Sequence, residues 1–588
     1  MHTIPAGMSD DDVLVASPEA NSAATDTVDT AAPAEVALQA PFSKFENRQH
    51  QLYPHLTPAE VSRLHRFGSR ACWKKDDYLY RIGDISPGMF VILSGRFRVL
   101  VRDGIGRETV LIEHGSGHFI CEVGQLSNKP AIASVLVLED VEALVITPES
   151  VRTLLTAEAE LGERIMRALI LRRAALIEKG VGPILLGCSV KSGLLPLQGF
   201  LQRNGYPHTV LDNRSDPDAV ALLERLAPTE DDFPLVLCPD GSILRAPDVG
   251  QLATHLGLIP EFDPATIYDV AIVGAGPAGL ATAVYAASEG LSVALFDFHA
   301  PGGQAGASAR IENYLGFPTG ISGNALAARA FIQAQKFGAR VAIPTRIKAL
   351  HCGNKPMQLE LFNGSRVSTR TVVIASGAVY RRPAIPELER YEDRGVYYWA
   401  SPIEAKLCKG EEIVVVGGGN SAGQAIAFLA SSASHVHVLI RAGGLEASMS
   451  KYLIDRISSL PNVTLHTRSE IVAFEGDEVS LKGVHCRCGG NEELIKSLPV
   501  RHVFLFVGAD PNTGWLHTCP VQLNDKGFVL TGADVEGPVS NKKPTLESSA
   551  PGVFAIGDVR WNSTKRVAAA VGEGAAAVAQ IHAFIAAM

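Results

Sequence analysis

The sequence predicts a multidomain α/β protein: an N-terminal β-barrel of jelly-roll type, a small α/β domain and two nested Rossmann-like domains. Three observations support this. The chain has 588 residues, which is too many for one hydrophobic core. Short strands separated by turns dominate its early part, as in barrels. Two glycine-rich loops, each between an apolar strand and a helix-forming run, lie in its second half, as in doubly wound sheets.

Composition and charge exclude several classes of partner. Hydrophobic residues make up 46% and charged residues 20% of the chain, as in ordinary globular proteins. The formal net charge of -9 gives no reason to expect nucleic acid, which requires a clustered basic surface. The N-terminus lacks the basic and apolar segments of a signal peptide, and we expect no membrane-spanning stretch. Nine scattered cysteines favour a reducing, cytoplasmic environment.

The N-terminal region divides into a tail and a β domain. Residues 1–44 are rich in Ala, Ser, Thr, Asp and Pro, so they cannot bury enough apolar surface to fold. Residues 45–180 combine short strands and Gly or Asp turns with two predicted helices, which is typical of a barrel or jelly roll. The expected helices cover residues 56–67 and 148–178.

Residues 120–135 resemble the phosphate-binding cassette of cyclic nucleotide-binding domains. In that family a Gly-Glu pair begins the cassette, and an Arg directly after a Pro holds the cyclic phosphate. Here Glu122 is present, but Cys121 stands at the Gly position and Ala131 follows Pro130. Because alanine cannot replace a bidentate guanidinium, a cyclic nucleotide is a doubtful ligand. The resemblance implies a retained barrel that serves for docking or for another ligand.

Residues 181–262 read as strand, helix, strand, helix, hairpin and helix. This order resembles the thioredoxin and glutaredoxin fold, with Pro234 where that family has its cis-proline. The family's CxxC belongs near residues 191–194, which contain no cysteine. Cys188 lies on the preceding strand and Cys238 just past Pro234, where buried cysteines are usually inert. We therefore expect a degenerate adaptor.

The first glycine loop follows the strand that ends at residue 273. Its glycines let backbone amides and a helix N-terminus approach a pyrophosphate. Asp297 ends the next strand, about twenty residues on, where an acid accepts hydrogen bonds from an adenosine ribose. The loop residues that we assign to this site are Gly274, Gly276, Pro277, Ala278 and Gly279.

From Tyr268 to its end the chain resembles the thioredoxin reductase family, because several separated segments agree in order. These are the first loop, the segment PGGQAGASARIENYLGFPTGISG, the strand VVIASGA, and GVFAIGDVR with KRVAAAVGEG. The resemblance implies an FAD-binding domain formed by residues 263–382 and 511–588. Beyond the loop and Asp297, it assigns to the flavin site Gly303, Gln304, Asn313, Ser376, Gly377, Gly557, Asp558, Arg566 and Val567.

The second glycine loop lies in an inserted NAD(P)-binding domain, residues 383–510. Arg441 ends its second strand, where an NAD-selective fold carries an acid, and a cation there suits the 2′-phosphate of NADPH. We therefore expect NADPH in preference to NADH. The loop residues assigned to this site are Gly417, Gly419, Asn420, Ser421 and Ala422.

The dithiol that the resemblance leads one to expect is absent. In thioredoxin reductases a CxxC and a general-acid Asp lie just before the second loop. By that match Trp399 and Pro402 replace the cysteines, and Ile403 replaces the acid. Neither tryptophan nor proline forms a disulfide, so the family's last step cannot run here. Another pair, Cys486 and Cys488, lies in an expected exposed hairpin, most simply as two free thiols.

Two classes of function follow. The first is an FAD-dependent oxidoreductase that passes hydride from NADPH to FAD and on to an acceptor: a thioredoxin-like protein, a ferredoxin as in ferredoxin-NADP reductases, or a small molecule. The second is a redox-sensing or regulatory flavoprotein with little turnover. Intact nucleotide loops favour the enzyme, although no catalytic side chain is assigned. The resemblance also implies a homodimer.

Overall fold

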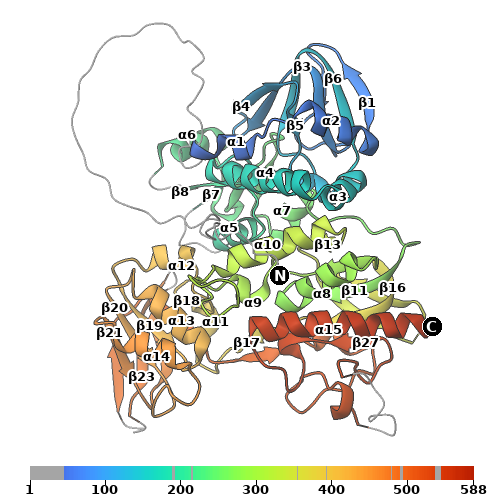
Figure 1. The fold of residues 1–588 in the computed structure, drawn as a ribbon. Helices are drawn as coiled ribbons and strands as arrows, with labels where there is room; N and C mark the ends of the chain where they lie inside the picture. Colours follow the sequence, from blue (N-terminus) through green and yellow to red (C-terminus); the bar gives the residue numbers. More distant parts are fainter. Residues whose placement is uncertain are drawn as a thin grey trace, which may run out of the picture.

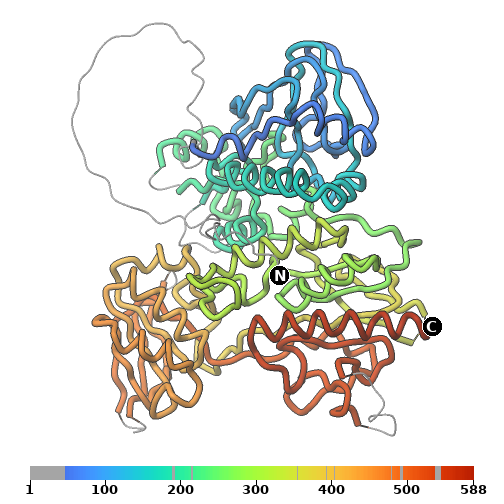
Figure 2. Tube along the Cα trace, viewed as in Figure 1, coloured from blue at the N-terminus to red at the C-terminus, as the bar shows by residue number. Residues whose placement is uncertain are grey.

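The computed structural model describes residues 46–187, 193–212, 216–353, 355–392, 394–477, 480–489, 494–536 and 545–588. The predicted tail, Cys188 and Lys191 lie outside these ranges. Figure 1 shows the β domain at the top, the two C-terminal domains below it and a small α/β domain at the junction. The colouring of Figure 2 shows that residues around 400–500 form a separate lobe, while the final residues return to the preceding domain.

The N-terminal domain is an antiparallel β structure, as predicted. Its central sheet has the order β1-β6-β3-β4, with β2 beside β6 and β5 beside β3. Apolar side chains of β3 and β6 fill its interior, including Phe90 and Val137, which are both fully buried. The strands are β1 (Ser69–Trp73), β2 (Tyr78–Tyr80), β3 (Met89–Arg102), β4 (Glu108–Gly115), β5 (Phe119–Ile120) and β6 (Ser134–Ile146). Short helical turns precede and interrupt them: α1 (Gln49–Leu52), α2 (Pro58–Leu64), η3 (His65–Phe67) and η4 (Val123–Ser127).

The prediction of one long helix over residues 148–178 is wrong. The structure has α3 (Pro148–Ala157) and α4 (Ala159–Glu178), which are separated by Glu158 in a non-helical conformation (φ -112°, ψ 82°). The two helices meet closely at Gly162, where a Cβ atom would lie 2.7 Å from the Leu155 carbonyl oxygen. A periodic apolar pattern continues through such a break, so periodicity alone does not reveal it.

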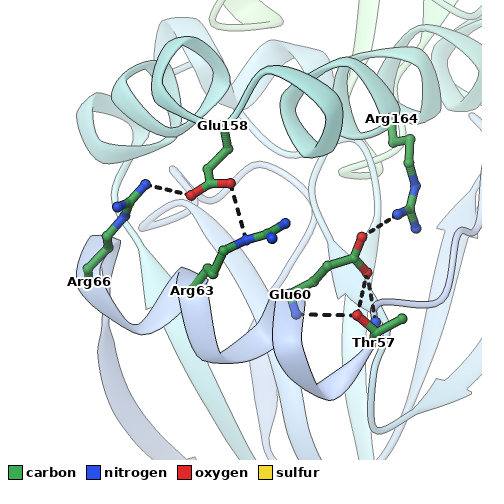
Figure 3. A network of polar contacts seen from close by, with 6 residues as sticks. All are labelled: Thr57, Glu60, Arg63, Arg66, Glu158 and Arg164. Carbon is green, nitrogen blue, oxygen red and sulfur yellow. Dashed lines mark hydrogen bonds and ion pairs between the residues drawn. The ribbon is translucent and has the colours of Figure 1, made fainter.

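Ion pairs with α2 and η3 hold the break in place (Figure 3). The Glu158 carboxylate lies 3.2 Å from Arg63 Nε and 2.5 Å from Arg66 Nη2. A second carboxylate, Glu60, pairs with Arg164 of α4 and with Thr57 at the start of α2. The contact partners of Glu158 lie more than ninety residues earlier, which explains why the local sequence gave no sign of them.

The small α/β domain has the predicted order of elements. Its sheet runs β10-β9-β7-β8, with β7 parallel to β8 and antiparallel to β9. The Phe233–Pro234 peptide is cis, as the sequence comparison anticipated. The elements are β7 (Ile184–Gly187), α5 (Leu194–Arg203), β8 (Thr209–Asp212), α6 (Pro217–Leu226), β9 (Leu235–Leu237), β10 (Ile243–Arg245) and α7 (Val249–His255).

The next domain is built on a sheet in the order β13-β12-β11-β16-β15-β14, with β27 beside β16. Strands β13, β12, β11, β16 and β27 are parallel, and β14 and β15 form an antiparallel extension. Its strands are β11 (Ile267–Val273), β12 (Val293–Phe296), β13 (Arg340–Ala342), β14 (Ile347–His351), β15 (Met357–Leu361), β16 (Arg366–Ile374) and β27 (Val553–Ala555). Its main helices are α8 (Pro277–Ser288), α9 (Gly303–Gly306), α10 (Gly323–Lys336) and α15 (Val567–Ala586).

The C-terminal helix α15 packs closely against α8, as its small residues predict. A Cβ atom at Gly574 would lie 2.8 Å from the Ala278 carbonyl oxygen. By length and composition alone, α15 could cross a membrane, because its most apolar stretch of 18 residues has a mean hydropathy of 1.3. Its Glu573 nevertheless forms an ion pair with Arg560 of the same domain, so the helix has specific partners within the fold.

The inserted domain has a parallel sheet in the order β18-β25-β19-β20-β21 and an antiparallel sheet β22-β23-β24. The chain enters and leaves it through two adjacent antiparallel strands, β17 (Ala378–Tyr380) and β26 (Ala509–Pro511). The remaining elements are α11 (Leu388–Tyr391), β18 (Val396–Tyr397), α12 (Pro402–Leu407), β19 (Glu412–Val416), α13 (Asn420–Leu429), β20 (His435–Leu439), α14 (Lys451–Ser458), β21 (Val463–His466), β22 (Glu470–Gly476), β23 (Leu481–Arg487), β24 (Ile495–Leu498) and β25 (His502–Leu505).

One disulfide joins Cys352, which follows β14, to Cys519, 167 residues later in the chain. No pattern in the sequence predicts this pair. The described cysteines outside it are free. The disulfide therefore links the antiparallel extension of the central sheet to the segment that follows the inserted domain.

We expect Glu158→Gln to reduce the local stability of α2 and α3 by about 1 kcal/mol, because it removes two ion pairs to largely exposed arginines. Hydrogen exchange of the amides in these helices measures the effect in the full chain. The matched control is Glu163→Gln, which removes one exposed pair with Arg167 and should cost about 0.3 kcal/mol. An equal loss in both variants would contradict the role given to Glu158.

Candidate functional site

The first glycine loop connects β11 to α8 and admits no larger residues at two positions. Gly274 has φ +111°, and a Cβ atom there would lie 2.1 Å from the Ala375 carbonyl oxygen. A Cβ atom at Gly279 would lie 1.8 Å from the Gly274 carbonyl oxygen. At Gly276, by contrast, a Cβ atom would meet no atom within 4 Å. The loop is thus tightly packed at Gly274 and Gly279 and open at Gly276. The open side lies next to the N-terminus of α8 at Pro277, where an anion would be stabilised.

Asp297 holds this loop from the end of β12. Its carboxylate accepts hydrogen bonds from the backbone N–H groups of Ala275 at 2.7 Å and His299 at 2.8 Å. The structure therefore brings Asp297 to the loop, as expected for an acid beside an adenosine ribose. The direct contacts show an additional role, because the carboxylate fixes the backbone that faces the open space.

The segment after Asp297 closes over the same loop. The Gly302 N–H donates to the Ala275 carbonyl oxygen at 2.7 Å, and a Cβ atom at Gly303 would lie 3.1 Å from Gly276 Cα. Gln304 donates from Nε2 to the Ala378 carbonyl oxygen at 2.6 Å. These contacts place Gly303 and Gln304 between the glycine loop and the crossing into the inserted domain.

The turn after β16 contacts the segment that returns from the inserted domain. Ser376 donates from Oγ to the Asn512 carbonyl oxygen at 2.7 Å, and the Asn512 N–H donates to the Gly377 carbonyl oxygen at 3.1 Å. Ser376 and Gly377 therefore join the two crossings. Asn313 is exposed, further along the segment that the sequence assigned to the flavin.

The turn before α15 presents an acid with no protein donor. Glu573 accepts from the Gly557 N–H at 2.6 Å and pairs with Arg560 at 2.5 Å, which fixes the turn. Asp558 is half-buried, and no hydrogen bond to its carboxylate is found within the described residues. Burial raises the pKa of Asp558, since the charged form loses water. A Cβ atom at Gly557 would lie 3.0 Å from Ala278 Cβ, so this turn adjoins the first loop.

Arg566 and Val567 begin the last helix. Arg566 is its N-cap and is exposed, while Val567 is half-buried in the first turn. The open front of the first loop, the free acceptor Asp558 and the N-terminus of α15 fit a flavin dinucleotide. The helix N-terminus supplies the partial positive charge that favours an anionic ligand.

The second glycine loop repeats the arrangement in the inserted domain. Gly417 has φ +139°, and a Cβ atom there would lie 2.4 Å from the Phe506 carbonyl oxygen. At Gly419 a Cβ atom would meet nothing within 4 Å. Asn420 accepts from the Ser450 N–H at 2.7 Å, which positions the start of α13. The other loop residues are Ser421, which is exposed, and Ala422, which is buried.

Arg441 lies exposed just beyond β20, and no ion pair to it is found within the described residues. Sequence reasoning missed a second cation, Arg468. Strand β21 is parallel to β20, with Leu439 opposite His466, so their carboxyl ends share one edge. The Arg468 N–H donates to the Ala442 carbonyl oxygen at 3.1 Å, and Arg468 is exposed with φ +49°, unusual for a non-glycine residue. A parallel-pairing prediction would have found it.

The positions expected for a dithiol hold a different network. Trp399 donates from Nε1 to Glu404 Oε1 at 3.0 Å, and the Ser401 N–H donates to Glu404 Oε2 at 2.8 Å. Pro402 is the first residue of α12. The Ile403 side chain lies outside the described parts. Glu404 is buried, so this carboxylate, one residue past Ile403, is a site residue that the sequence comparison did not identify.

The buried free thiols that the structure describes do not supply a dithiol. The expectation of an exposed CxC hairpin is wrong for Cys486, which is buried in the central strand β23 of its sheet. Burial raises the pKa of Cys486 to about 12, and those of Cys238 and Cys408 to about 11. At neutral pH these groups are therefore thiols rather than nucleophilic thiolates.

The small α/β domain reaches this region through the end of α5. Arg203 is half-buried, and burial lowers its pKa while the negative charges of Asp297 and Glu404 raise it. The neighbouring Asn204 donates from Nδ2 to the His299 carbonyl oxygen at 3.5 Å. The charge of Arg203 therefore interacts with Asp297 at the first glycine loop and with Glu404, the acceptor of Trp399. Nothing in the local sequence indicates this placement.

Two family models match the chain. Residues 268–574 match the pyridine nucleotide-disulphide oxidoreductase model, and residues 71–158 match the cyclic nucleotide-binding domain model. The first match covers both glycine loops and the turn at Asp558. The second covers the β domain together with α3.

Similar proteins include NADPH-dependent thioredoxin reductase 3 of Arabidopsis thaliana, 32% identical over 314 residues, which cover 52% of this chain and 56% of that protein. The chain thus spans little more than half of this relative. Thioredoxin reductase of Escherichia coli O157:H7 is 31% identical over 305 residues, covering 52% of this chain and 91% of that protein. A solved thioredoxin reductase of Lactococcus lactis, in the FR conformation, matches with 26% identity and a TM-score of 0.50, over 55% of this chain and 100% of that one.

We expect Gly279→Ala to abolish the visible flavin absorbance of the purified protein, because the new methyl group would overlap the Gly274 carbonyl oxygen and push α8 away from β11. The matched control is Gly572→Ala on α15, where a Cβ atom meets nothing within 4 Å. The absorbance per protein should remain unchanged in the control. Full flavin content in Gly279→Ala would show that the loop does not hold the cofactor.

Proposed function

Because this chain belongs to the pyridine nucleotide-disulphide oxidoreductase family, as a thioredoxin reductase-like enzyme, we propose that it oxidises NADPH through FAD and reduces an acceptor outside its own chain. The proposal rests on the difference between the two glycine loops and the positions expected for the dithiol. Both glycine loops retain the open front of a dinucleotide site, whereas Trp399 and Pro402 stand at the dithiol positions and Trp399 is held by a hydrogen bond to Glu404. Bound FAD would supply a ring that accepts hydride and passes electrons on.

The chain's own residues have positioning roles in this proposal. Asp297 holds the first loop, and Asp558 offers an acceptor to a ligand hydroxyl. Arg441 and Arg468 provide two positive charges at one sheet edge, neither of them in an ion pair with another described residue, and they suit the 2′-phosphate of NADPH. The second of these cations, Arg468, comes from the segment that follows the neighbouring strand β21.

The acceptor is external in this proposal, since neither Trp399 nor Pro402 can form a disulfide. A thioredoxin-like protein, a ferredoxin and a small molecule such as a quinone or dioxygen are the three classes to test. The residues around Trp399 and Glu404 would then shape the approach of that acceptor.

We further propose that residues 181–262 form a thioredoxin-like adaptor without redox function. Its strand order and cis-Pro234 support this, and a Cβ atom at Gly193, at the start of α5, would lie 2.9 Å from Pro234 Cδ. Cys238 is buried with a raised pKa. The adaptor would act through the placement of Arg203 near Asp297 and Glu404.

That placement also favours the second candidate, a redox-sensing flavoprotein. A change in charge at the flavin site would act directly on Arg203 and so on the adaptor. The two candidates differ in turnover, because a sensor stops after one reduction and an enzyme does not.

The test is steady oxidation of NADPH by the flavin-loaded full chain with an oxidised thioredoxin, a ferredoxin or a quinone. We expect many turnovers with at least one acceptor. The control is Gly417→Val, whose side chain would clash with the Phe506 carbonyl oxygen and close the second loop while leaving the flavin bound. A single stoichiometric reduction with every acceptor would reject the enzyme and support the sensor.

We expect Arg441→Ala and Arg468→Ala each to raise the KM for NADPH by about tenfold, because each removes one charge-assisted contact to the 2′-phosphate. The KM for NADH should stay within about twofold. The matched control is Lys451→Ala, an exposed lysine of the same domain that pairs with Asp455. If only Arg441→Ala shows the effect, Arg468 lies outside the site.

A further inference from the structure

The β domain contains a cavity beneath the cassette-like segment, and its walls combine aliphatic and aromatic side chains. The cavity is partly open to solvent. The residues that matter below are Tyr53, Tyr80, Phe97, His114, Phe119 and Arg172. Most of the other lining side chains are aliphatic, among them Val99 of β3 and Leu176 of α4. An apolar ligand body would therefore find contacts on several sides.

The cavity also holds a positive charge that lacks an acidic partner. Arg172 of α4 donates from Nε, Nη1 and Nη2 to the carbonyl oxygens of Leu52, Cys121 and Phe119, at 2.9 to 3.2 Å. No carboxylate is found within ion-pair distance of it in the described parts of the chain. Its guanidinium has five N–H groups, so two donors remain beyond these three bonds. Its carbon Cζ lies 4.4 Å from the Phe119 ring centroid and 5.0 Å from that of Tyr53.

The acid that lines the cavity does not neutralise this charge. Glu122 pairs with Arg173 and accepts the Gly124 N–H at 2.7 Å. The negative charge of Glu122 is therefore already balanced by Arg173, the residue that follows Arg172 in α4. Enclosure of an unpaired cation is costly, and burial lowers the pKa of Arg172. An anionic ligand would remove that cost.

A second polar group in the cavity is without a partner. The Nε2 atom of His114 is buried and has no hydrogen-bond partner among the described residues. Its ring stacks on His118 with a centroid distance of 4.0 Å. Burial lowers the pKa of His114 to about 3, so the ring is neutral at physiological pH and its Nε2 atom is available for one hydrogen bond to a ligand.

We propose that this cavity binds a small organic carboxylate with an aromatic or acyl body. The carboxylate would accept the two free N–H donors of Arg172, the body would lie among the ring side chains, and His114 would hydrogen-bond a polar group at Nε2. A cyclic nucleotide fits less well. Ala131 offers no guanidinium to a cyclic phosphate, and the Arg173 ion pair occupies Glu122, the acid of the cassette.

Contacts connect the cavity to the rest of the chain. Arg173, next to Arg172, donates from Nη1 to the Gly205 carbonyl oxygen of the small domain at 3.3 Å. Lys129 of the cassette lies 5.7 Å from the ring centroid of Phe331 on α10. A ligand that moves the cassette would therefore act on two neighbouring domains, one of which carries Arg203.

The test is calorimetric titration of the flavin-loaded full chain with phenylacetate, 4-phenylbutyrate and octanoate, with 4-phenylbutyramide as the neutral analogue. We expect saturable binding of at least one carboxylate and binding of the amide that is at least about tenfold weaker. Arg172→Gln should weaken carboxylate binding about tenfold or more, and Arg172→Lys less. The matched control, Arg164→Gln, alters the same helix at a residue that pairs with Glu60 and should leave binding unchanged.

Because Arg172 also supports three carbonyl groups, a second variant tests the cavity with the guanidinium intact. Val99→Trp should fill the space and block carboxylate binding, while near-UV circular dichroism and flavin content show that the protein remains folded. Absence of binding by all three carboxylates up to millimolar concentration overturns the proposal. It is equally overturned if cyclic AMP binds more tightly than any of them, or if the amide binds as well as the carboxylate.

Discussion

One continuous apolar core joins the small α/β domain to the central sheet of the flavin-type domain. Side chains from α5 and α7, such as Phe200 and Leu252, belong to the same buried cluster as Val270 and Ile272 of β11. Burial of apolar area contributes about 25 cal/mol per Å², so a shared core of this kind fixes two domains more firmly than scattered polar contacts. The position of Arg203 depends on it. The small domain is therefore part of the reductase body rather than a tethered arm.

The shared core also determines which domains the β domain contacts. The β domain contacts the small domain through Arg173 of α4 and the flavin-type domain through Lys129 of the cassette, so it lies against both domains that share the core. The nicotinamide-type domain makes a different kind of contact, an ion pair of 2.9 Å between Arg456 and Glu312. An ion pair between half-exposed side chains is weak and screened by salt, so this contact holds the two domains together less firmly than the shared core holds the small domain.

Features encoded by neighbouring residues were predictable from the sequence, and features that depend on distant partners were not. The glycine loops depend on local features, the positive φ angles of Gly274 and Gly417 and the contact of Gly279 with Gly274, so their spacing in the sequence was sufficient. The break at Glu158 depends on arginines from an earlier helix, and the periodicity around it carries no trace of them. The Cys352–Cys519 disulfide and the buried state of Cys486 depend on the tertiary fold in the same way.

The two crossings between the flavin-type and nicotinamide-type domains are adjacent strands. Ala378 pairs with Pro511 and Tyr380 with Ala509, and an Arg381–Asp510 ion pair of 2.6 Å follows directly. An insertion whose ends lie side by side leaves the topology of its host unchanged whatever its size. Evolution could therefore have exchanged or lost such a unit without refolding the flavin domain, and a chimaera made at these two strands would preserve both sheets.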